Sequence, residues 1–234
     1  MRLDKFLASS GLGSRSEIKN YIRKGFVTVN SETAKITDLN INPDTDEVCF
    51  KSERVDLSGD KYYILNKPAG YVCADTDDDS LTVLSLFPES MRDGLHTVGR
   101  LDKDTTGLLL LSTDGKFIHE MISPRKKVEK TYFVVCEKSV TDEDLLKLES
   151  GVDIGDDEIT KPARTQRGAK DNEIFLTITE GRFHQVKRML QVTCNKVIFL
   201  KRVSFGGVSF DESHLSEGEF RELTESEISI LRKG

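Results

Sequence analysis

Long apolar runs and paired cysteines are both missing from this chain of 234 residues. No stretch approaches the roughly 18 apolar residues of a membrane helix, and residues 1–20 hold no apolar core of signal-peptide length. The four cysteines, Cys49, Cys73, Cys136 and Cys194, form no CxxC pair, which argues against a zinc site and fits free thiols in a reducing compartment. We therefore expect a cytoplasmic globular protein without membrane association.

Charge is distributed unevenly along the chain, whose formal net charge is −6. Residues 1–30 carry six basic residues against two acidic ones, whereas residues 31–60 carry three against eight. Residues 181–210 form a second basic zone, with six basic residues and no acidic one. Two concentrated basic zones in an acidic protein favour an anionic partner that meets defined faces. The alternative is a chance clustering of charge on a solvated surface.

The first basic zone shows helical order. Apolar side chains within residues 3–7 follow the i, i+3, i+4 spacing of one helix face. Ser14 and Glu17 then form an S-x-x-E capping box, which predicts the start of a second helix. Residues 26–30 alternate like a short strand. Basic residues recur every four positions along the second helix, at Arg15, Lys19 and Arg23.

Residues 1–50 resemble the S4 RNA-binding domain. The spacing of the two helices, the GSRSE cap and the G-x-V-x-V-N ending carry this resemblance. It implies docking on structured RNA through phosphate contacts, which supply affinity and orientation but little sequence reading. The implied RNA-binding residues are Arg2, Lys5, Arg15, Lys19, Arg23 and Lys24. The alternative is a helical hairpin that only packs on the rest of the chain.

Beyond a polar linker at residues 51–61, predicted strands outnumber predicted helices. Strands are expected at residues 62–65, 107–113, 130–137, 172–181 and 196–210, and helices at 81–87, 141–151 and 182–193. Because the order is not a strict β-α-β alternation, we expect an α+β fold whose mixed, largely antiparallel sheet is flanked by helices. We predict two domains, residues 1–58 and residues 59–234.

Two further features are compatible with catalysis. The helix at residues 182–193 is amphipathic, with a polar basic stripe that includes His184 and Lys187; such a stripe is usually a solvated face. Asp102 lies in a charged loop before the leucines of residues 108–111, a buried strand that would support a carboxylate rigidly. Carboxylates act in glycosyl chemistry as nucleophiles or acid–base groups, although a single aspartate in a loop is a weak signal.

Four motifs, in family order, resemble those of pseudouridine synthases. They are NKPAG at residues 66–70, GRLDKDTTGLLLLSTDG at 99–115, KTY at 130–132 and TEGRFHQVKRM at 179–189. Together with the S4-like segment they are similar to the RsuA-type group, which acts on ribosomal RNA. The stretches ISPRKKVEKTY and EGEFRELTESEI are most similar to the enzyme for small-subunit 16S ribosomal RNA.

The resemblance implies a role for each matching position. Asp102 would attack or assist at the ribose C1′, so that uracil leaves its N-glycosidic bond, turns and rejoins through C5. Tyr132 would stack on the base, and Lys187 would pair with Asp102 and keep it ionised. Arg100 would fill the gap left by the flipped nucleotide. The other implied substrate-binding residues are Leu200, Arg182, His184, Gln185 and Arg188. No metal or organic cofactor is implied.

The implied partner is ribosomal RNA, with 16S favoured, either free or within an assembling small subunit. We expect the protein to act as a monomer. Two alternatives stay open at this point. One keeps the enzyme and moves its target to 23S ribosomal RNA, and the other is a non-catalytic RNA-binding assembly factor on the same fold. Mapping pseudouridine in ribosomal RNA separates these hypotheses.

Overall fold

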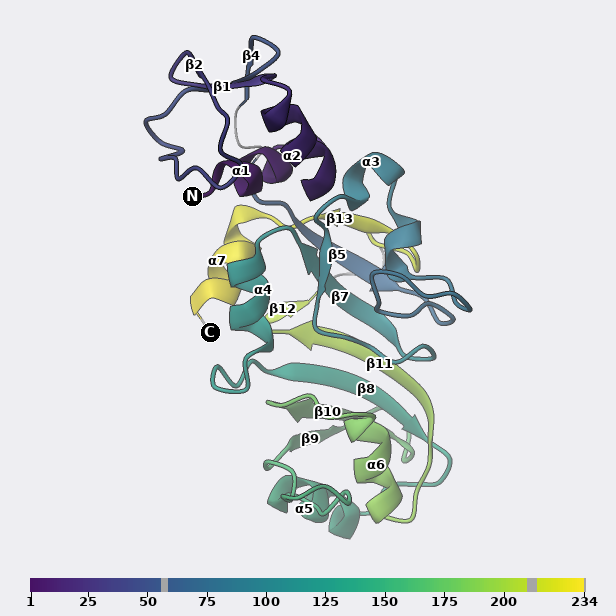
Figure 1. Ribbon diagram of the computed structural model, residues 1–234. Helices are drawn as coiled ribbons and strands as arrows, with labels where there is room; N and C mark the ends of the chain where they lie inside the picture. The colour runs from purple at the N-terminus through teal and green to yellow at the C-terminus, as the bar shows by residue number, and fades with distance from the viewer. Residues whose placement is uncertain (56–58, 210–213, 234) are drawn as a thin grey trace. The chain divides into compact units, whose positions relative to one another are not determined.

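The computed structural model describes residues 1–55, 59–209 and 214–233 (Figure 1). The chain forms two compact units, one of Met1–Lys61 with Phe87–Leu95 and one of Tyr62–Leu86 with His96–Gly234. The predicted domain boundary at residue 58 lies outside the described residues and stays a prediction. The same holds for the predicted end of the last strand at Phe210.

The first unit contains the two helices that its sequence predicts, α1 (Leu3–Ser9) and α2 (Arg15–Arg23). At the start of α2, Glu17 N donates to Ser14 Oγ at 3.4 Å, and Ser14 N donates to the Glu17 carboxylate at 2.8 Å. This reciprocal cap satisfies backbone N–H groups that a helix start otherwise leaves without partners. A short third helix, α3 (Glu89–Arg92), also belongs to this unit.

The sheet of the first unit has the strand order β2-β1-β3-β4, and all its pairs are antiparallel. Its strands are β1 (Val27–Val29), β2 (Glu32–Thr33), β3 (Val48–Phe50) and β4 (Glu53–Arg54). β4 corrects the prediction of an irregular linker from residue 51, because a left-handed turn at Lys51 and Ser52 folds β4 back onto β3. Helices and sheet share an apolar core of Leu3, Phe6, Leu7, Ile18, Ile22, Val27, Ala34, Ile41 and Val48.

The second unit is built on one large sheet with the order β13-β5-β7-β11-β8-β10-β9, where β6 also pairs with β7 and β12 with β11. The strands are β5 (Tyr62–Lys67), β6 (His96–Val98), β7 (Thr106–Ser112), β8 (Lys130–Cys136), β9 (Arg164–Arg167), β10 (Glu173–Ile178), β11 (Val197–Phe205), β12 (Val208–Ser209) and β13 (Phe220–Glu222). Only β7 and β11 pair in parallel among the described strands. The prediction of a mixed, largely antiparallel α+β fold is confirmed.

Helices cover this sheet at both ends (Figure 1). They are α4 (Gly115–Ile122), α5 (Asp142–Ser150), α6 (Gln185–Val192) and α7 (Glu225–Lys233). The predicted helix at residues 81–87 is only a 3₁₀ turn, η1 (Val83–Leu86). Among the described residues, no helix has both the length and the apolar character needed to cross a bilayer.

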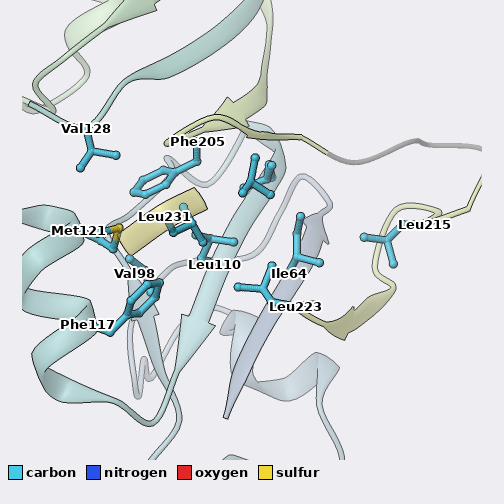
Figure 2. Packing of buried hydrophobic residues seen from close by; sticks show 12 residues of the cluster. Ile64, Val98, Leu110, Phe117, Met121, Val128, Phe205, Leu215, Leu223 and Leu231 are labelled. Carbon is cyan, nitrogen blue, oxygen red and sulfur yellow. The ribbon is translucent and has the colours of Figure 1, made fainter. Parts of the chain in front are cut away.

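β7 is the buried strand that the four leucines predict, since Leu108, Leu109, Leu110 and Leu111 are all fully buried. Leu108 and Leu110 face a core that α4 and α7 close (Figure 2). Its members are Ile64, Val98, Leu108, Leu110, Phe117, Met121, Val128, Phe205, Val208, Leu215, Leu223 and Leu231. Burying one such side chain contributes about 1.5–3 kcal/mol, so this core holds the start of β7 firmly in place.

Candidate active site

A cavity of about 570 Å³ opens in the second unit, next to the start of β7. Segments far apart in the sequence line it because β7, β11 and β8 are neighbours in the sheet. Of the predicted catalytic and substrate-binding residues, those that line the cavity are Arg100, Asp102, Tyr132, Arg182, His184, Gln185, Lys187 and Leu200. Arg188 is not among the described residues that line it.

Gly107 lets β7 and β11 approach closely at this point. The parallel register places Gly107 beside Arg202, and Gly107 has φ +97°. A Cβ atom added at Gly107 would lie 2.3 Å from the carbonyl oxygen of Arg202. Because any side chain here would collide with backbone, glycine is required. The loop that carries Asp102 precedes β7 and is therefore held beside β11.

Lys67, in the NKPAG motif, fastens the loop that carries Asp102. Its side chain is fully buried, and its ammonium donates to the carbonyl oxygens of Asp102 at 3.2 Å, Lys103 at 3.3 Å and Thr105 at 2.8 Å. Burial lowers the pKa of Lys67. This role of Lys67 is not visible in the sequence, because these three hydrogen bonds reach residues 35 or more positions away.

The structure brings Lys187 and His184 to the Asp102 carboxylate. Lys187 Nζ lies 3.0 Å from Asp102 Oδ2, and His184 Nε2 lies 3.6 Å from Asp102 Oδ1. The side chains of Asp102 and Lys187 are 27% and 22% exposed. A partly buried ammonium at this distance attracts the carboxylate and limits its motion.

Asp104 is a second partner of Lys187 that sequence reasoning missed. Its Oδ1 lies 2.6 Å from Lys187 Nζ. Burial alone would lower the pKa of Lys187, but the hydrogen bonds to Asp104 and Asp102 outweigh it and raise that pKa. Burial would likewise raise the pKa of Asp104, and the contact with Lys187 reverses this and lowers it. Lys187 is therefore held as an ammonium between two carboxylates.

The helix predicted from Arg182 in fact begins at Gln185, because His184 adopts a left-handed backbone conformation with φ 47°. The Gln185 side chain braces the preceding turn: its Nε2 donates to Glu180 Oε1 at 2.8 Å, and its Oε1 accepts from Arg182 N at 2.9 Å. Gln185 is 4% exposed. Gln185 therefore has a structural role in this turn. It also lines the cavity, and its predicted substrate contact stays a prediction.

Arg182 and Arg188 also make contacts within the protein, and their predicted substrate contacts stay predictions. Both guanidinium groups bind the loop around Asp156: Arg188 Nη2 lies 2.5 Å from Asp156 Oδ1, and Arg182 Nη1 donates to the Glu158 carbonyl oxygen at 2.5 Å. Arg188 also holds the Phe183 carbonyl oxygen at 3.1 Å. The second basic zone is therefore not a free cationic face, since acidic groups from another part of the chain occupy two of its arginines.

Tyr132 and Leu200 line the cavity from neighbouring strands. Tyr132 is 8% exposed and lies directly opposite Arg202 in the pairing of β8 and β11, and Leu200 is 6% exposed. Arg100 is exposed at the rim. Phe183, which the sequence analysis did not single out, is 71% exposed, and its ring stacks on His184 with centroids 3.9 Å apart. An exposed aromatic ring at a cavity is a surface on which a nucleobase can stack.

The predicted RNA-binding residues of the first unit are all exposed. Arg2 differs from the others because its guanidinium binds Asp4 at 2.7 Å, and this hydrogen bond lowers the pKa of the buried Asp4 carboxyl. Within the described part of the chain, the other five form no ion pair and remain available to phosphates: Lys5, Arg15, Lys19, Arg23 and Lys24.

The four cysteines of the chain are free thiols, as predicted. In the described segments, no three or more His, Cys, Asp or Glu side chains are grouped so that they could hold a metal ion. The residues that line the cavity include the Asp102 carboxylate, the Lys187 ammonium beside it and the Tyr132 hydroxyl.

Comparison with family models finds two matches. Residues 61–192 match the RNA pseudouridylate synthase family, and residues 1–47 match the S4 domain. The first match spans all the segments of the cavity up to α6. The second spans the two helices and the first two strands of the first unit.

Similar proteins and structures agree with these matches over the full chain. An uncharacterized RNA pseudouridine synthase of Bacillus subtilis is 45% identical over 100% of this chain and 99% of its own length. The ribosomal small subunit pseudouridine synthase A of Haemophilus influenzae is 42% identical over 100% of this chain and 100% of its own length. The ribosomal small subunit pseudouridine synthase A of Escherichia coli is 40% identical over 99% of this chain and 100% of its own length. A crystal structure of a pseudouridylate synthase superposes with a TM-score of 0.71 at 41% identity, covering 99% of both chains.

Proposed function

This chain belongs to the RNA pseudouridylate synthase family, and on that premise we propose that it converts one uridine of small-subunit 16S ribosomal RNA to pseudouridine, with Asp102 as the catalytic carboxylate. The observation that carries the proposal is the Asp102 carboxylate at the cavity, 3.0 Å from the Lys187 ammonium. The choice of the small subunit rests on the names of the relatives from Haemophilus influenzae and Escherichia coli.

In the proposed reaction, Asp102 attacks or stabilises C1′ of the target ribose. The N1–C1′ bond breaks with its electron pair on the uracil, and the base turns. A C5–C1′ bond then forms; where Asp102 has attacked C1′, the bond between them breaks in the same step and its electron pair returns to the carboxylate. The proton on C5 then leaves, and N1 ends protonated, so the overall change is an isomerisation. Lys187 keeps the Asp102 carboxylate in position throughout, because its ammonium lies 3.0 Å away and attracts the carboxylate.

The target uridine must leave its stack to reach the cavity. Tyr132 and Leu200 are suited to receive the flat base, since both are nearly buried and line the cavity. Arg100 at the rim is suited to fill the gap left in the RNA, and its guanidinium can stack on bases or bind phosphate. Phe183, stacked on His184, supplies an aromatic face for an unpaired nucleotide beside the target.

The first unit would hold the RNA outside the cavity. Five exposed cations that form no ion pair among the described residues suit phosphate contacts, which give affinity without reading sequence. Arg2 is the least suited of the predicted set because Asp4 already neutralises it. All four cysteines are free thiols, which supports a protein that acts in the reducing cytoplasm, where ribosomal subunits assemble.

The test is a map of pseudouridine at nucleotide resolution in ribosomal RNA from cells that lack the protein. We expect one 16S uridine to lose its modification, and the wild-type protein to restore it where Asp102→Asn does not. Loss of a 23S modification instead would move the target to the large subunit. An unchanged map in both RNAs would contradict the proposed function.

A further inference from the structure

We propose that Arg202, Thr105 and Lys130 form a site for the uracil ring, where they bind its carbonyl oxygens and stabilise the negative charge that the base acquires when its N-glycosidic bond breaks. The three residues line the same cavity as Asp102. This inference rests on the proposed function and adds residues that the sequence motifs left without a role.

Arg202 is a buried cation with an unused donor. The residue is 1% exposed, its Nε donates to the Leu108 carbonyl oxygen at 2.7 Å, and its guanidinium lies 5.1 Å from the centre of the Phe205 ring. Its Nη2 has no hydrogen-bond partner among the described residues. Leaving a buried charged donor unpaired is costly, so folded proteins seldom do it without a functional reason. Two contacts hold the guanidinium in place while Nη2 stays ready for a ligand.

Thr105 supplies a second unused polar atom in the same cavity. Its Oγ1 is buried without a partner, and the residue is 1% exposed. Thr105 N donates to the Asp102 carbonyl oxygen at 3.1 Å, so the hydroxyl lies on the turn that presents the catalytic carboxylate. Among the described residues, three buried side-chain nitrogen or oxygen atoms lack partners, and two of them belong to residues that line this cavity.

Lys130 adds a second cation next to Arg202. Lys130 lies opposite Phe205 in the pairing of β8 and β11, and its ammonium lies 5.4 Å from the centre of the Phe205 ring. The ammonium also donates to the Val128 carbonyl oxygen at 2.8 Å. No carboxylate forms an ion pair with Lys130 in the described segments. Burial, and then the charge of Arg202, lower the pKa of Lys130 to about 8. An anionic group bound between these two cations would relieve their repulsion.

The surroundings favour a nucleobase over a phosphate as the occupant. Tyr132, Leu200 and Phe205, each less than 10% exposed, form the nearby cavity wall and suit a flat, weakly hydrated ring. When the N1–C1′ bond breaks, the electron pair stays on uracil and spreads to its carbonyl oxygens. Fixed donors in a dry site stabilise such a developing charge far better than water does. Arg100, exposed at the rim, is better placed for a phosphate.

The test separates chemistry from RNA binding in three variants, Arg202→Gln, Lys130→Met and Thr105→Val. Single-turnover rates with saturating enzyme are measured on an RNA fragment that carries the mapped uridine, and the dissociation constant is measured separately against salt. We expect Arg202→Gln to slow the saturated rate about 10²-fold, with smaller losses for the other two and dissociation constants within about threefold of wild type. Lys161→Met is the matched control, because Lys161 acts on Lys130 only through its charge and is not among the described lining residues.

The opposite pattern would overturn the proposal. A phosphate role would weaken RNA binding and reduce the salt slope by about 0.7–0.9, with the saturated rate unchanged. Thermal unfolding shows whether Arg202→Gln is folded. If it is not, the single-turnover rates of Lys130→Met and Thr105→Val test the proposed site. Wild-type rates in both of these variants would overturn the proposal. Wild type without turnover would contradict the proposed function and this inference together, whereas active wild type with fully active variants would overturn this inference alone.

Discussion

The cations of the two units differ in their surroundings. In the first unit, five of the six predicted RNA-binding residues are exposed and form no ion pair within the described part of the chain. In the second unit, three cations at or near the cavity have a fixed geometry: Lys67 binds three loop carbonyl oxygens, Lys187 joins two carboxylates, and Arg202 is anchored at Leu108.

This difference separates affinity from chemistry. Exposed charges act through counterion release, so their effects are salt-dependent, individually small and spread over several residues. Charges in a partly dry cavity act at short range with little screening, so removing a single one changes the reaction strongly. The predictions below test whether binding and catalysis divide between the units in this way.

Asp102→Asn should have the largest effect. The amide keeps the shape and volume of the side chain but cannot act as a carboxylate, so pseudouridine formation should fall at least about 10³-fold. RNA affinity should stay within about threefold, because the phosphate contacts are elsewhere. Quantifying pseudouridine in the RNA product checks the first point and a binding titration the second. Appreciable turnover by this variant would refute the assigned mechanism.

Lys187→Met should lower kcat about 10²-fold, since Asp102 loses the ammonium that holds its carboxylate in place. The free energy of unfolding should change by only about 1 kcal/mol or less, as for other partly exposed ion pairs. Asp104→Asn is the matched control: it removes the other carboxylate and leaves the contact of Lys187 with Asp102, so we expect a change of less than about threefold. Equal losses in both variants would mean that Asp104 shares the catalytic role.

Replacing Arg15, Lys19 and Arg23 together by alanine should act on binding alone. Three lost phosphate contacts should reduce the salt slope of log K by about 2 to 3 and weaken RNA binding about tenfold at physiological salt. The rate at saturating enzyme should be unchanged. Arg2→Ala is the control with a smaller expected effect on binding, since Asp4 already occupies that guanidinium. A fall in the rate of the triple variant at saturating enzyme would show that the first unit also contributes to catalysis.

Lys130 should give the smallest effect, a pH dependence of stability. Burial lowers its pKa from 10.5 to about 8 in the folded protein, so between those values the unfolded chain binds more protons than the folded one. The free energy of unfolding should therefore rise with pH across this window, and the rise should be larger in wild type than in Lys130→Met. Denaturant titrations at pH 8 and 10 measure the difference. Parallel behaviour of the two proteins would show that Lys130 is not desolvated.

Local sequence patterns determined a large part of this protein. The capping box at Ser14 and Glu17, the buried leucines of β7 and the helix α5 within residues 141–151 all follow from patterns of a few residues, and each is where its pattern predicts it. The irregular order of strands and helices also indicated an α+β fold with a mixed sheet. Spacing of 2 or 3.6 residues is a property of the backbone and therefore visible in the sequence.

The tertiary structure decided which charges meet, because charge pairing depends on distances in space and not along the chain. Periodicity placed Arg188 and Lys187 on one polar stripe, yet folding directs Arg188 to Asp156 and Lys187 to Asp102 and Asp104. The sequence likewise does not reveal that Arg202 loses its water while one guanidinium nitrogen stays unpaired beside Asp102's cavity. That arrangement exists only because Gly107 lets β7 and β11 run side by side.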